Sequence, residues 1–152
     1  MLMLPLRVIK LLKRYSLLGI FVSAILSSIS VVPVTQTVSL VAGRYMNPLL
    51  VGFVSALGNV VGEIVFYSLG YTGKLLVEDQ AWYDTVSGYM QKIGFFAVVL
   101  VSAIPAPAVN VVATIAGSVN YPIVKYLLAS FLGNWLQFTL LAYISYATNY
   151  IF

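Results

Sequence analysis

The sequence has 152 residues, of which 61% are hydrophobic and only 8% are charged, and its mean hydropathy is +1.00. A typical soluble domain is about 45–50% apolar and about 25% charged, and so short a chain cannot bury this much apolar surface in a core of its own. The composition therefore predicts an integral membrane protein. It excludes a soluble enzyme, a nucleic-acid-binding domain and a disordered chain.

The side chains that carry most enzyme chemistry are scarce. Cysteine and histidine are absent, and the four acidic residues are Glu63, Glu78, Asp79 and Asp84. The last three lie in one polar stretch, so the sequence predicts neither a metal site nor a pair of catalytic carboxylates. We expect no enzymatic activity and no cofactor.

The net charge of +4 is concentrated near the N-terminus, where Arg7, Lys10, Lys13 and Arg14 are interleaved with apolar residues. This pattern predicts a basic amphipathic helix over residues 1–16 that lies on an anionic membrane surface. A cleaved signal peptide is the alternative, but the apolar region that follows is long and has no evident cleavage site.

Four hydrophobic blocks follow this helix in chain order: 17–45, 48–71, 93–119 and 121–150. A polar connector, residues 72–92, separates the second block from the third. The second and fourth blocks are long enough to cross a bilayer as single helices, for which about 20 apolar residues suffice. Proline interrupts the other two blocks, at Pro33 in the first and at Pro105 and Pro107 in the third.

The first half of the hydrophobic region, residues 17–71, is repeated in residues 93–152. The matching positions, which lie 74 and then 75 residues apart, are Pro33 with Pro107, Gln36 with Asn110, Ala42-Gly43 with Ala116-Gly117, Pro48 with Pro122, and Leu57-Gly58-Asn59 with Leu132-Gly133-Asn134. Each repeat is predicted to be a hairpin of two short helices followed by one span, which inverts the second repeat relative to the first. Interrupted helices in inverted repeats are typical of membrane transporters. Full spans kinked by proline are the alternative.

The predicted hairpins are expected to be re-entrant. Each leg would reach about 20 Å, which is past the middle of a hydrocarbon core of roughly 30 Å but short of its far side. Arg44 then returns to the side of the basic N-terminus, which the positive-inside rule places in the cytoplasm. The connector 72–92 lies on the other side, where it can form an interfacial helix. We expect the cell membrane as the location, with an organelle membrane left open.

The run from Leu57 to Lys74 contains a glycine, a Gly-acid pair, a tyrosine, and a pair of glycines with a basic residue. This order and spacing resembles the DedA/VTT (SNARE-associated) family of membrane proteins, and the resemblance covers residues 28 to 143. Further segments that fit the family pattern are Ala42-Gly43, Ala116-Gly117 and Leu132-Gly133-Asn134-Trp135. The segment from Pro105 to Gly117, with Asn110, is most similar to the subgroup that has a Pro-Phe-Asn motif.

The resemblance implies that the protein handles lipids. Members are described as flippases for polyprenyl phosphate or phospholipid, or as phospholipid scramblases, and some are linked to proton-dependent transport. The chain departs from many bacterial members at Gln36, where they carry an acid. It also departs at Ser102, Ala103 and Ala108, where they carry arginines around the second hairpin proline.

Glu63 is the leading candidate for a functional residue, because a carboxylate inside an apolar span is costly and usually has a role. It could bind and release a proton during a transport cycle. The alternative is an acid that serves helix packing and pairs with a cation, and the candidate cations are Lys74, Lys92 and Lys125.

The candidate substrate-binding residues are Gln36, Asn110, Arg44 and Ser102. Gln36 and Asn110 could bind a headgroup oxygen near the hairpin tips, or could instead bind backbone groups freed at the prolines. Arg44 could attract an anionic headgroup or act only as a topological anchor, and Ser102 could assist at the second tip. The helix N-termini that follow the prolines favour an anion such as phosphate.

Helix packing is expected at a set of small and amide residues near Glu63. Gly58, Gly62 and Gly133 should allow close helix contacts, and Asn59 and Asn134 could hydrogen-bond across the helix pair.

The sequence as a whole predicts a flippase or scramblase that moves a lipid with a phosphate headgroup, with membrane lipids and protons as its partners. Two alternatives remain open. One is a small-solute or ion transporter on the same scaffold, and the other is a non-transporting membrane scaffold that binds a partner helix. The short chain also favours a homo-oligomer.

Overall fold

A computed structural model describes the backbone of residues 6–30, 34–105 and 108–151, and the side chains of residues 16–29, 34–105 and 108–148. These residues form six α-helices and one short 3-10 helix: α1 (Leu6–Ser30), α2 (Val34–Gly43), α3 (Pro48–Thr72), η1 (Lys74–Leu76), α4 (Tyr83–Ser102), α5 (Ala108–Ser118) and α6 (Ile123–Ile151). The described part of the chain contains no strand, and the predicted all-α fold class is confirmed.

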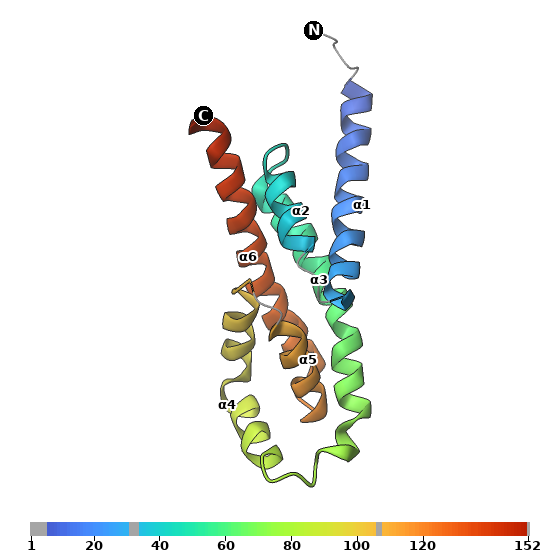
Figure 1. Ribbon diagram of the computed structural model, residues 1–152, viewed down its shortest axis with the longest axis vertical. Helices are drawn as coiled ribbons and strands as arrows, with labels where there is room; N and C mark the ends of the chain where they lie inside the picture. Colours follow the sequence, from blue (N-terminus) through green and yellow to red (C-terminus); the bar gives the residue numbers. More distant parts are fainter. Residues whose placement is uncertain (1–5, 31–33, 106–107, 152) are drawn as a thin grey trace.

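The helices form two hairpins that open toward opposite ends of an elongated molecule (Figure 1). α1 runs from one end to the middle, α2 returns to that end, and α3 then crosses the whole length. From the far end α4 rises to the middle, α5 returns, and α6 crosses back (Figure 1). This order of helices is compatible with the predicted inverted repeats, which stay a prediction.

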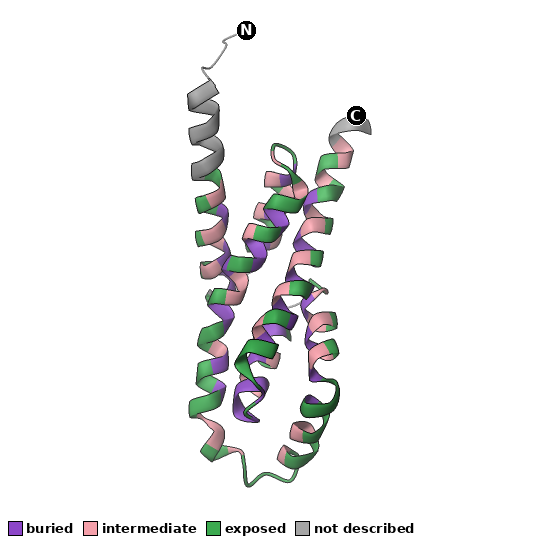
Figure 2. Cartoon of the chain, turned by 180° about the vertical axis from the view of Figure 1, so that it is seen from behind, coloured by how far each residue is buried: buried purple, intermediate pink, exposed green. Residues whose placement is uncertain are grey.

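Many large hydrophobic side chains are exposed on the outer faces of the helices. The buried residues line the inward faces (Figure 2). Within the described residues, three helices are long and apolar enough to cross a membrane: Pro48–Thr72, Tyr83–Ser102 and Ile123–Thr148. α2 and α5 have 10 and 11 residues, and at 1.5 Å per residue they reach only about half of a bilayer core. The composition and these helices describe an integral membrane protein.

Two helices run across predicted boundaries. The described part of the basic segment 1–16, residues 6–16, is not a separate helix, because α1 runs without a break from Leu6 to Ser30. Likewise α4 begins at Tyr83, inside the predicted connector 72–92, and continues past the expected boundary at residue 93. Neither junction contains a proline, so nothing in the local sequence stops the helix, and each first leg is longer than predicted.

Of the three predicted proline breaks, Pro105 lies within the described residues. Pro33 and Pro107 lie outside the described residues. α4 ends at Ser102, and Pro105 lies in a bend three residues later. A residue before proline avoids the helical region, which is consistent with an end of α4 just before Pro105.

Local capping fixes the start of α3 and the turn between α5 and α6. Asn47 Oδ1 accepts hydrogen bonds from the backbone N–H groups of Leu49 (2.9 Å) and Leu50 (3.4 Å), and Pro48 occupies the first helical turn. After α5, Asn120 adopts a left-handed conformation with φ 53°. Asn is one of the few residues other than glycine that visits this region readily.

The second legs of the two hairpins pack on the span of the other repeat. A Cβ on Gly43 of α2 would overlap the carbonyl oxygen of Ala142 in α6, and a Cβ on Gly117 of α5 would overlap that of Tyr67 in α3. Gly43 and Gly117 are matching positions of the sequence repeat, and Tyr67 and Ala142 are separated by its later offset of 75. The two contacts are therefore equivalent, and they interlock the two halves of the chain.

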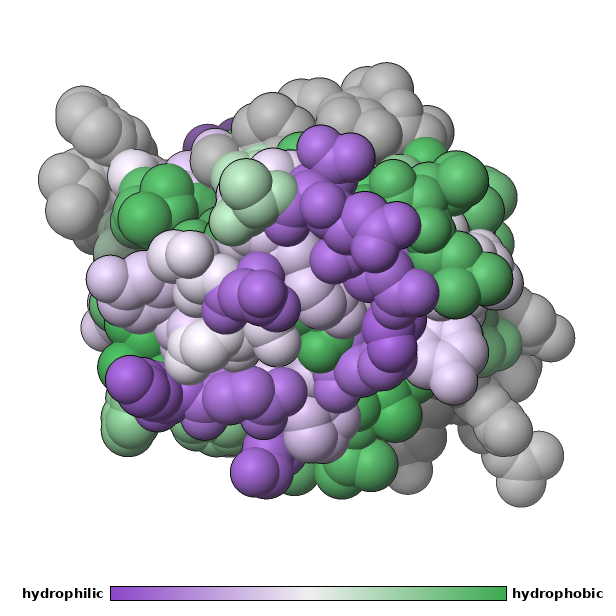
Figure 3. Space-filling model, turned by 90° about the horizontal axis from the view of Figure 1, so that it is seen from below, coloured by the Kyte–Doolittle hydropathy of each residue, from purple (hydrophilic) through white to green (hydrophobic). Residues whose placement is uncertain are grey.

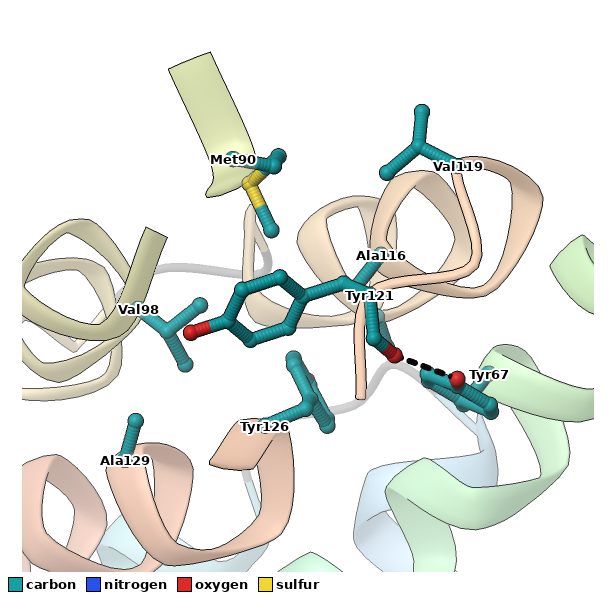
Figure 4. Packing of buried hydrophobic residues seen from close by; sticks show 9 residues of the cluster. Tyr67, Met90, Val98, Ala116, Val119, Tyr121, Tyr126 and Ala129 are labelled. Carbon is teal, nitrogen blue, oxygen red and sulfur yellow. Dashed lines mark hydrogen bonds between the residues drawn. The ribbon is translucent and has the colours of Figure 1, made fainter. Parts of the chain in front are cut away.

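A core cluster that includes Tyr67, Tyr121 and Tyr126 packs α3, α4, α5 and α6 together (Figure 4). The ring of Tyr121 extends from the α5–α6 turn between α4 and α6, and Gly94 lies against it. Tyr67 Oη donates a hydrogen bond of 2.6 Å to the carbonyl of Tyr121, which ties α3 to this turn. The cluster holds the second hairpin against the long helices and so positions the residues around Glu63.

The end of the molecule that carries η1 is hydrophilic at its surface, with apolar side chains around the polar band (Figure 3). The exposed polar residues of this segment include Glu78, Asp79, Gln80 and Asp84. Such an end suits contact with water and lipid headgroups, whereas the apolar flanks suit lipid tails.

Candidate functional site: a buried carboxyl group between α3 and α6

Glu63 lies in the middle of α3 and its side chain is 0% exposed. It faces α6, which runs antiparallel to α3 (Figure 1). A buried charge in an apolar span is stabilised only when polar groups surround it.

Four neutral side chains surround the carboxyl group. Asn59, one turn earlier on α3, donates from Nδ2 to Glu63 Oε1 at 2.8 Å, and Asn134 Nδ2 donates to the same oxygen at 2.9 Å. Tyr126 Oη donates to Oε2 at 2.8 Å, and Ser130 Oγ donates to Oε2 as well. Tyr126, Ser130 and Asn134 are spaced by four residues, so one stripe of α6 supplies three of the four donors.

The two carboxylate oxygens have different surroundings. The amide nitrogens beside Oε1 can only donate, whereas the hydroxyls of Tyr126 and Ser130 beside Oε2 can donate or accept. The site can therefore hold the ionised group, with two donors on each oxygen. It can also hold the protonated group, with the proton on Oε2 and one hydroxyl turned to accept it.

The predicted alternative of an ion pair between Glu63 and a lysine is wrong. Lys74 forms an ion pair with Glu78, at 3.8 Å and within the η1 end of the molecule. Lys92 and Lys125 are exposed, and the partners of Glu63 are all neutral.

Ser102 connects this cluster to the tip of the second hairpin. Its hydroxyl is buried and donates to Ser130 Oγ at 3.4 Å. Because Ser102 is the last residue of α4, a chain of hydroxyls leads from Glu63 through Ser130 to the hairpin bend.

Asn110 brings the tips of the two hairpins together. Its Nδ2 donates a hydrogen bond of 2.9 Å to the carbonyl of Ser28, in the last turn of α1. Such a carbonyl has no partner within its own helix, so Asn110 has the backbone-binding role that the sequence left open. Gly62 lies directly against Ser28, and the two tips therefore meet beside Glu63.

The other predicted residues lie at different places. Gln36 lies in the first turn of α2 and its Oε1 is buried without a hydrogen-bond partner. Arg44 is exposed in the turn after α2, at the opposite end of that helix. The structure does not bring Arg44 to Glu63, but it places the α2–α3 turn at the same end of the molecule as the start of α1 (Figure 1).

The predicted packing glycines lie where the helices approach most closely. Gly58 and Gly62 of α3 lie against α1, and Gly133 of α6 lies against Val99 and Ser102 of α4. These contacts bring the backbones close enough for short side chains at the hairpin tips to reach the Glu63 cluster.

Sequence reasoning missed two of the four residues that bind Glu63, namely Tyr126 and Ser130. A signal for them exists, because Tyr126, Ser130 and Asn134 form a polar stripe with helical spacing in an otherwise apolar helix. The predicted pair Asn59 and Asn134 meets at one carboxylate oxygen, which explains why both repeats carry an amide at this position.

Interrupted hairpins, long apolar spans and a buried carboxyl group define a polytopic helical membrane protein with a polar centre. The family model of the VTT domain matches residues 31–147, and the chain belongs to this family. The match confirms the resemblance to the DedA/VTT proteins, a family of membrane-transporter-like proteins, while the assignment to a subgroup stays a prediction. No curated protein matches the chain, and no solved structure does.

Proposed function

We propose that the protein moves a lipid with a phosphate headgroup across the bilayer, and that Glu63 binds and releases a proton during the cycle. The observation that carries the proposal is the buried carboxyl group with neutral partners, placed where the two hairpin tips meet. The headgroup would pass this polar centre while its tails remain in the surrounding lipid. The proposal assigns no enzymatic reaction to the protein.

The interrupted helices support a substrate path at the same level. α2 and α5 begin in the middle of the molecule (Figure 1), and their first N–H groups lack partners within the helix. One of these groups, the N–H of Thr35, is bound by Ser27 Oγ at 3.1 Å. The positive ends of the two helix dipoles favour an anion at midplane depth, as in other transporters built from inverted repeats.

Protonation of Glu63 would change the hydrogen bonds that lead to the second hairpin. A proton on Oε2 requires one neighbouring hydroxyl to accept instead of donate. If Ser130 accepts, its own proton can turn toward Ser102, and the direction of the Ser102–Ser130 hydrogen bond is reversed. The proton would thereby act on the end of α4 and couple Glu63 to the conformation of the hairpin tip.

The proposed topology places both hairpins as re-entrant elements. The end with the basic N-terminus and Arg44 would face the cytoplasm, by the positive-inside rule, and the acidic η1 end would lie on the opposite side of the cell membrane. A homo-oligomer is part of the proposal as well.

The proposal is tested by lipid movement in vesicles that contain the purified full-length protein. A fluorescent phospholipid, a polyprenyl phosphate and a diacylglycerol without phosphate are compared, each with and without a pH gradient. We expect faster movement of the phosphate-bearing lipids and a dependence on the gradient. Absence of movement for both phosphate lipids, from folded protein, would contradict the proposal, and gradient-driven uptake of a soluble ion instead would favour a solute transporter.

A further inference from the structure

The tip of the first hairpin carries an unusual group of polar atoms. Among the described side chains, buried polar atoms without a hydrogen-bond partner are Ser28 Oγ, Thr35 Oγ1, Gln36 Oε1, Gln137 Nε2 and Thr139 Oγ1. Three of these residues belong to the end of α1 and the start of α2. Buried polar groups are normally paired, because leaving one unpaired costs about as much as a lost hydrogen bond.

The second hairpin does not share this property. The positions that match Ser28, Thr35 and Gln36 at the repeat offset of 74 are Ser102, Val109 and Asn110. Ser102 donates to Ser130, Val109 is apolar, and Asn110 donates to the carbonyl of Ser28. These described side chains of the second hairpin thus have partners or need none, whereas Ser28, Thr35 and Gln36 of the first hairpin retain unused hydrogen-bonding capacity.

Gln36 and Gln137 lie at similar levels along the molecule, and Ser28 and Thr35 lie at the contact between α1 and α2. Ser27 Oγ accepts a hydrogen bond from the backbone N–H of Thr35, so the end of α1 touches the first turn of α2. α2 and α6 run in the same direction and meet at Gly43 and Ala142 (Figure 1). Gln36 is seven residues before Gly43 and Gln137 is five before Ala142, so their levels differ by about 3 Å at 1.5 Å per residue.

The chemistry of this group fits an anion with several acceptor oxygens. The hydroxyls of Ser28 and Thr35 and the amide of Gln137 can donate, and the amide of Gln36 can present either its oxygen or its nitrogen. Helical side chains lean toward the N-terminus, which places the Thr35 hydroxyl beside the positive end of the α2 dipole. Thr35 is 1% exposed and Gln137 is 4% exposed, so these two ligands are shielded from the surface.

We propose that the last turn of α1 and the first turn of α2, together with Gln137 of α6, form the binding site for the phosphate group, with Ser28, Thr35, Gln36 and Gln137 as its ligands. This inference rests on the proposed function and makes it more specific, since the two tips then have different roles. The first tip binds the headgroup, and the second tip responds to Glu63 through Ser130 and Ser102.

The proposal predicts that loss of an unpaired hydroxyl weakens phosphate binding but does not lower the stability of the free protein. Thr35→Val keeps the shape of the side chain and removes an unpaired hydroxyl, so the free protein should be as stable as the native one or more stable. Phosphate binding should become at least tenfold weaker. A residue with a purely structural role would show the reverse, with lower stability and unchanged binding.

The test uses the full-length protein in detergent without phosphate. Titration with a short-chain phosphatidic acid, the matching short-chain diacylglycerol and inorganic phosphate is followed by calorimetry. The native protein should bind the phosphatidic acid and not the diacylglycerol. Equal binding of inorganic phosphate would support the site and identify free phosphate as a ligand, whereas binding of phosphatidic acid alone would identify the lipid headgroup.

Matched variants separate this site from the rest of the molecule. Thr35→Val and Gln137→Leu should each weaken binding at least tenfold, and Ser28→Ala is the further variant should one of these fail to fold. Thr148→Val and Ser23→Ala, whose hydroxyls bond to carbonyls of their own helices, should bind like the native protein.

Native-like binding by the folded Thr35→Val and Gln137→Leu proteins would overturn the inference. If vesicle assays with the same proteins still show lipid movement, only the assignment of the site fails and the proposed function stands. Binding of phosphatidic acid that depends on Thr35, in a protein that moves no lipid, would support the site and contradict the proposed function.

Discussion

The close contact between Gly117 and α3 allows a quantitative test of the interlocked fold. In Gly117→Ala the new Cβ would overlap the carbonyl oxygen of Tyr67 and lie 2.8 Å from the backbone nitrogen of Tyr71. Both obstacles are backbone atoms of α3, which cannot rotate aside as a side chain can. The substitution should therefore push α5 away from α3.

The expected magnitude follows from two opposing effects. Alanine is favoured over glycine inside a helix by about 1 kcal/mol, whereas overpacking of a tight contact costs typically 1–3 kcal/mol, with the upper end of about 3 kcal/mol expected against backbone. Gly117→Ala should thus destabilise the protein by about 2 kcal/mol. Gly88 of α4 has no heavy atom near its Cβ position, so Gly88→Ala should stabilise by up to about 1 kcal/mol.

The two variants are compared by equilibrium unfolding in mixed micelles, as the free energy of unfolding relative to the native protein. The difference between them should be about 3 kcal/mol, the sum of these two effects. Gly43→Ala is the equivalent change in the first repeat and should resemble Gly117→Ala, because Ala142 obstructs it in the same way. Equal stability of Gly117→Ala and Gly88→Ala would refute the interlocked packing.

Three further predictions concern single contacts. Tyr67→Phe removes the 2.6 Å hydrogen bond to the carbonyl of Tyr121 and should lower the free energy of unfolding by about 1 kcal/mol; an unchanged value in the same unfolding assay would mean that the bond contributes nothing. Asn110→Leu removes the link to Ser28 and should loosen the two tips, seen as a broader distance distribution between spin labels on α1 and α5 in this cysteine-free chain. Asn120→Val places a β-branched residue at φ 53° and should cost roughly 1–2 kcal/mol, whereas Asn120→Gly should cost little; similar stability of both would argue against the left-handed turn.

The fold class and the order of the elements could be predicted because their causes are local in the sequence. The apolar composition indicates that the protein is surrounded by lipid. The prolines within two of the apolar blocks indicate where each hairpin turns. The collinear repeat then specifies their order and orientation. Glu63 stands out for the same reason, since one acid within an apolar span is visible without any knowledge of tertiary contacts.

The helix boundaries could be predicted less accurately than the fold class, because polarity is a poor guide to where a helix ends. The basic start of α1 and the polar start of α4 continue into apolar helix without any residue that stops it. The end of a helix depends on proline, glycine and capping side chains, as at Asn47 before α3.

The partners of Glu63 depend on tertiary packing and were only half predictable. Asn59 and Asn134 were visible through the repeat. At the same offset Tyr126 matches the apolar Val51, and although Ser130 matches Ser55, a serine in an apolar helix is no specific sign of a carboxylate partner. The difference between the two hairpin tips was also hidden, because Gln36 and Asn110 look equivalent in the sequence. Only the structure shows that Asn110 has a partner while Gln36 Oε1 has none.

The central claim is that Glu63 carries the proton that drives or permits lipid movement. It is tested most directly by Glu63→Gln, which keeps the shape of the side chain and removes the titrating group, with Glu78→Gln as the matched control at the exposed η1 end. The measurement is the rate of phospholipid movement in vesicles as a function of the pH gradient. The account predicts that Glu63→Gln abolishes the dependence on the gradient and that Glu78→Gln keeps it. Native rates and native gradient dependence in folded Glu63→Gln protein would contradict the account.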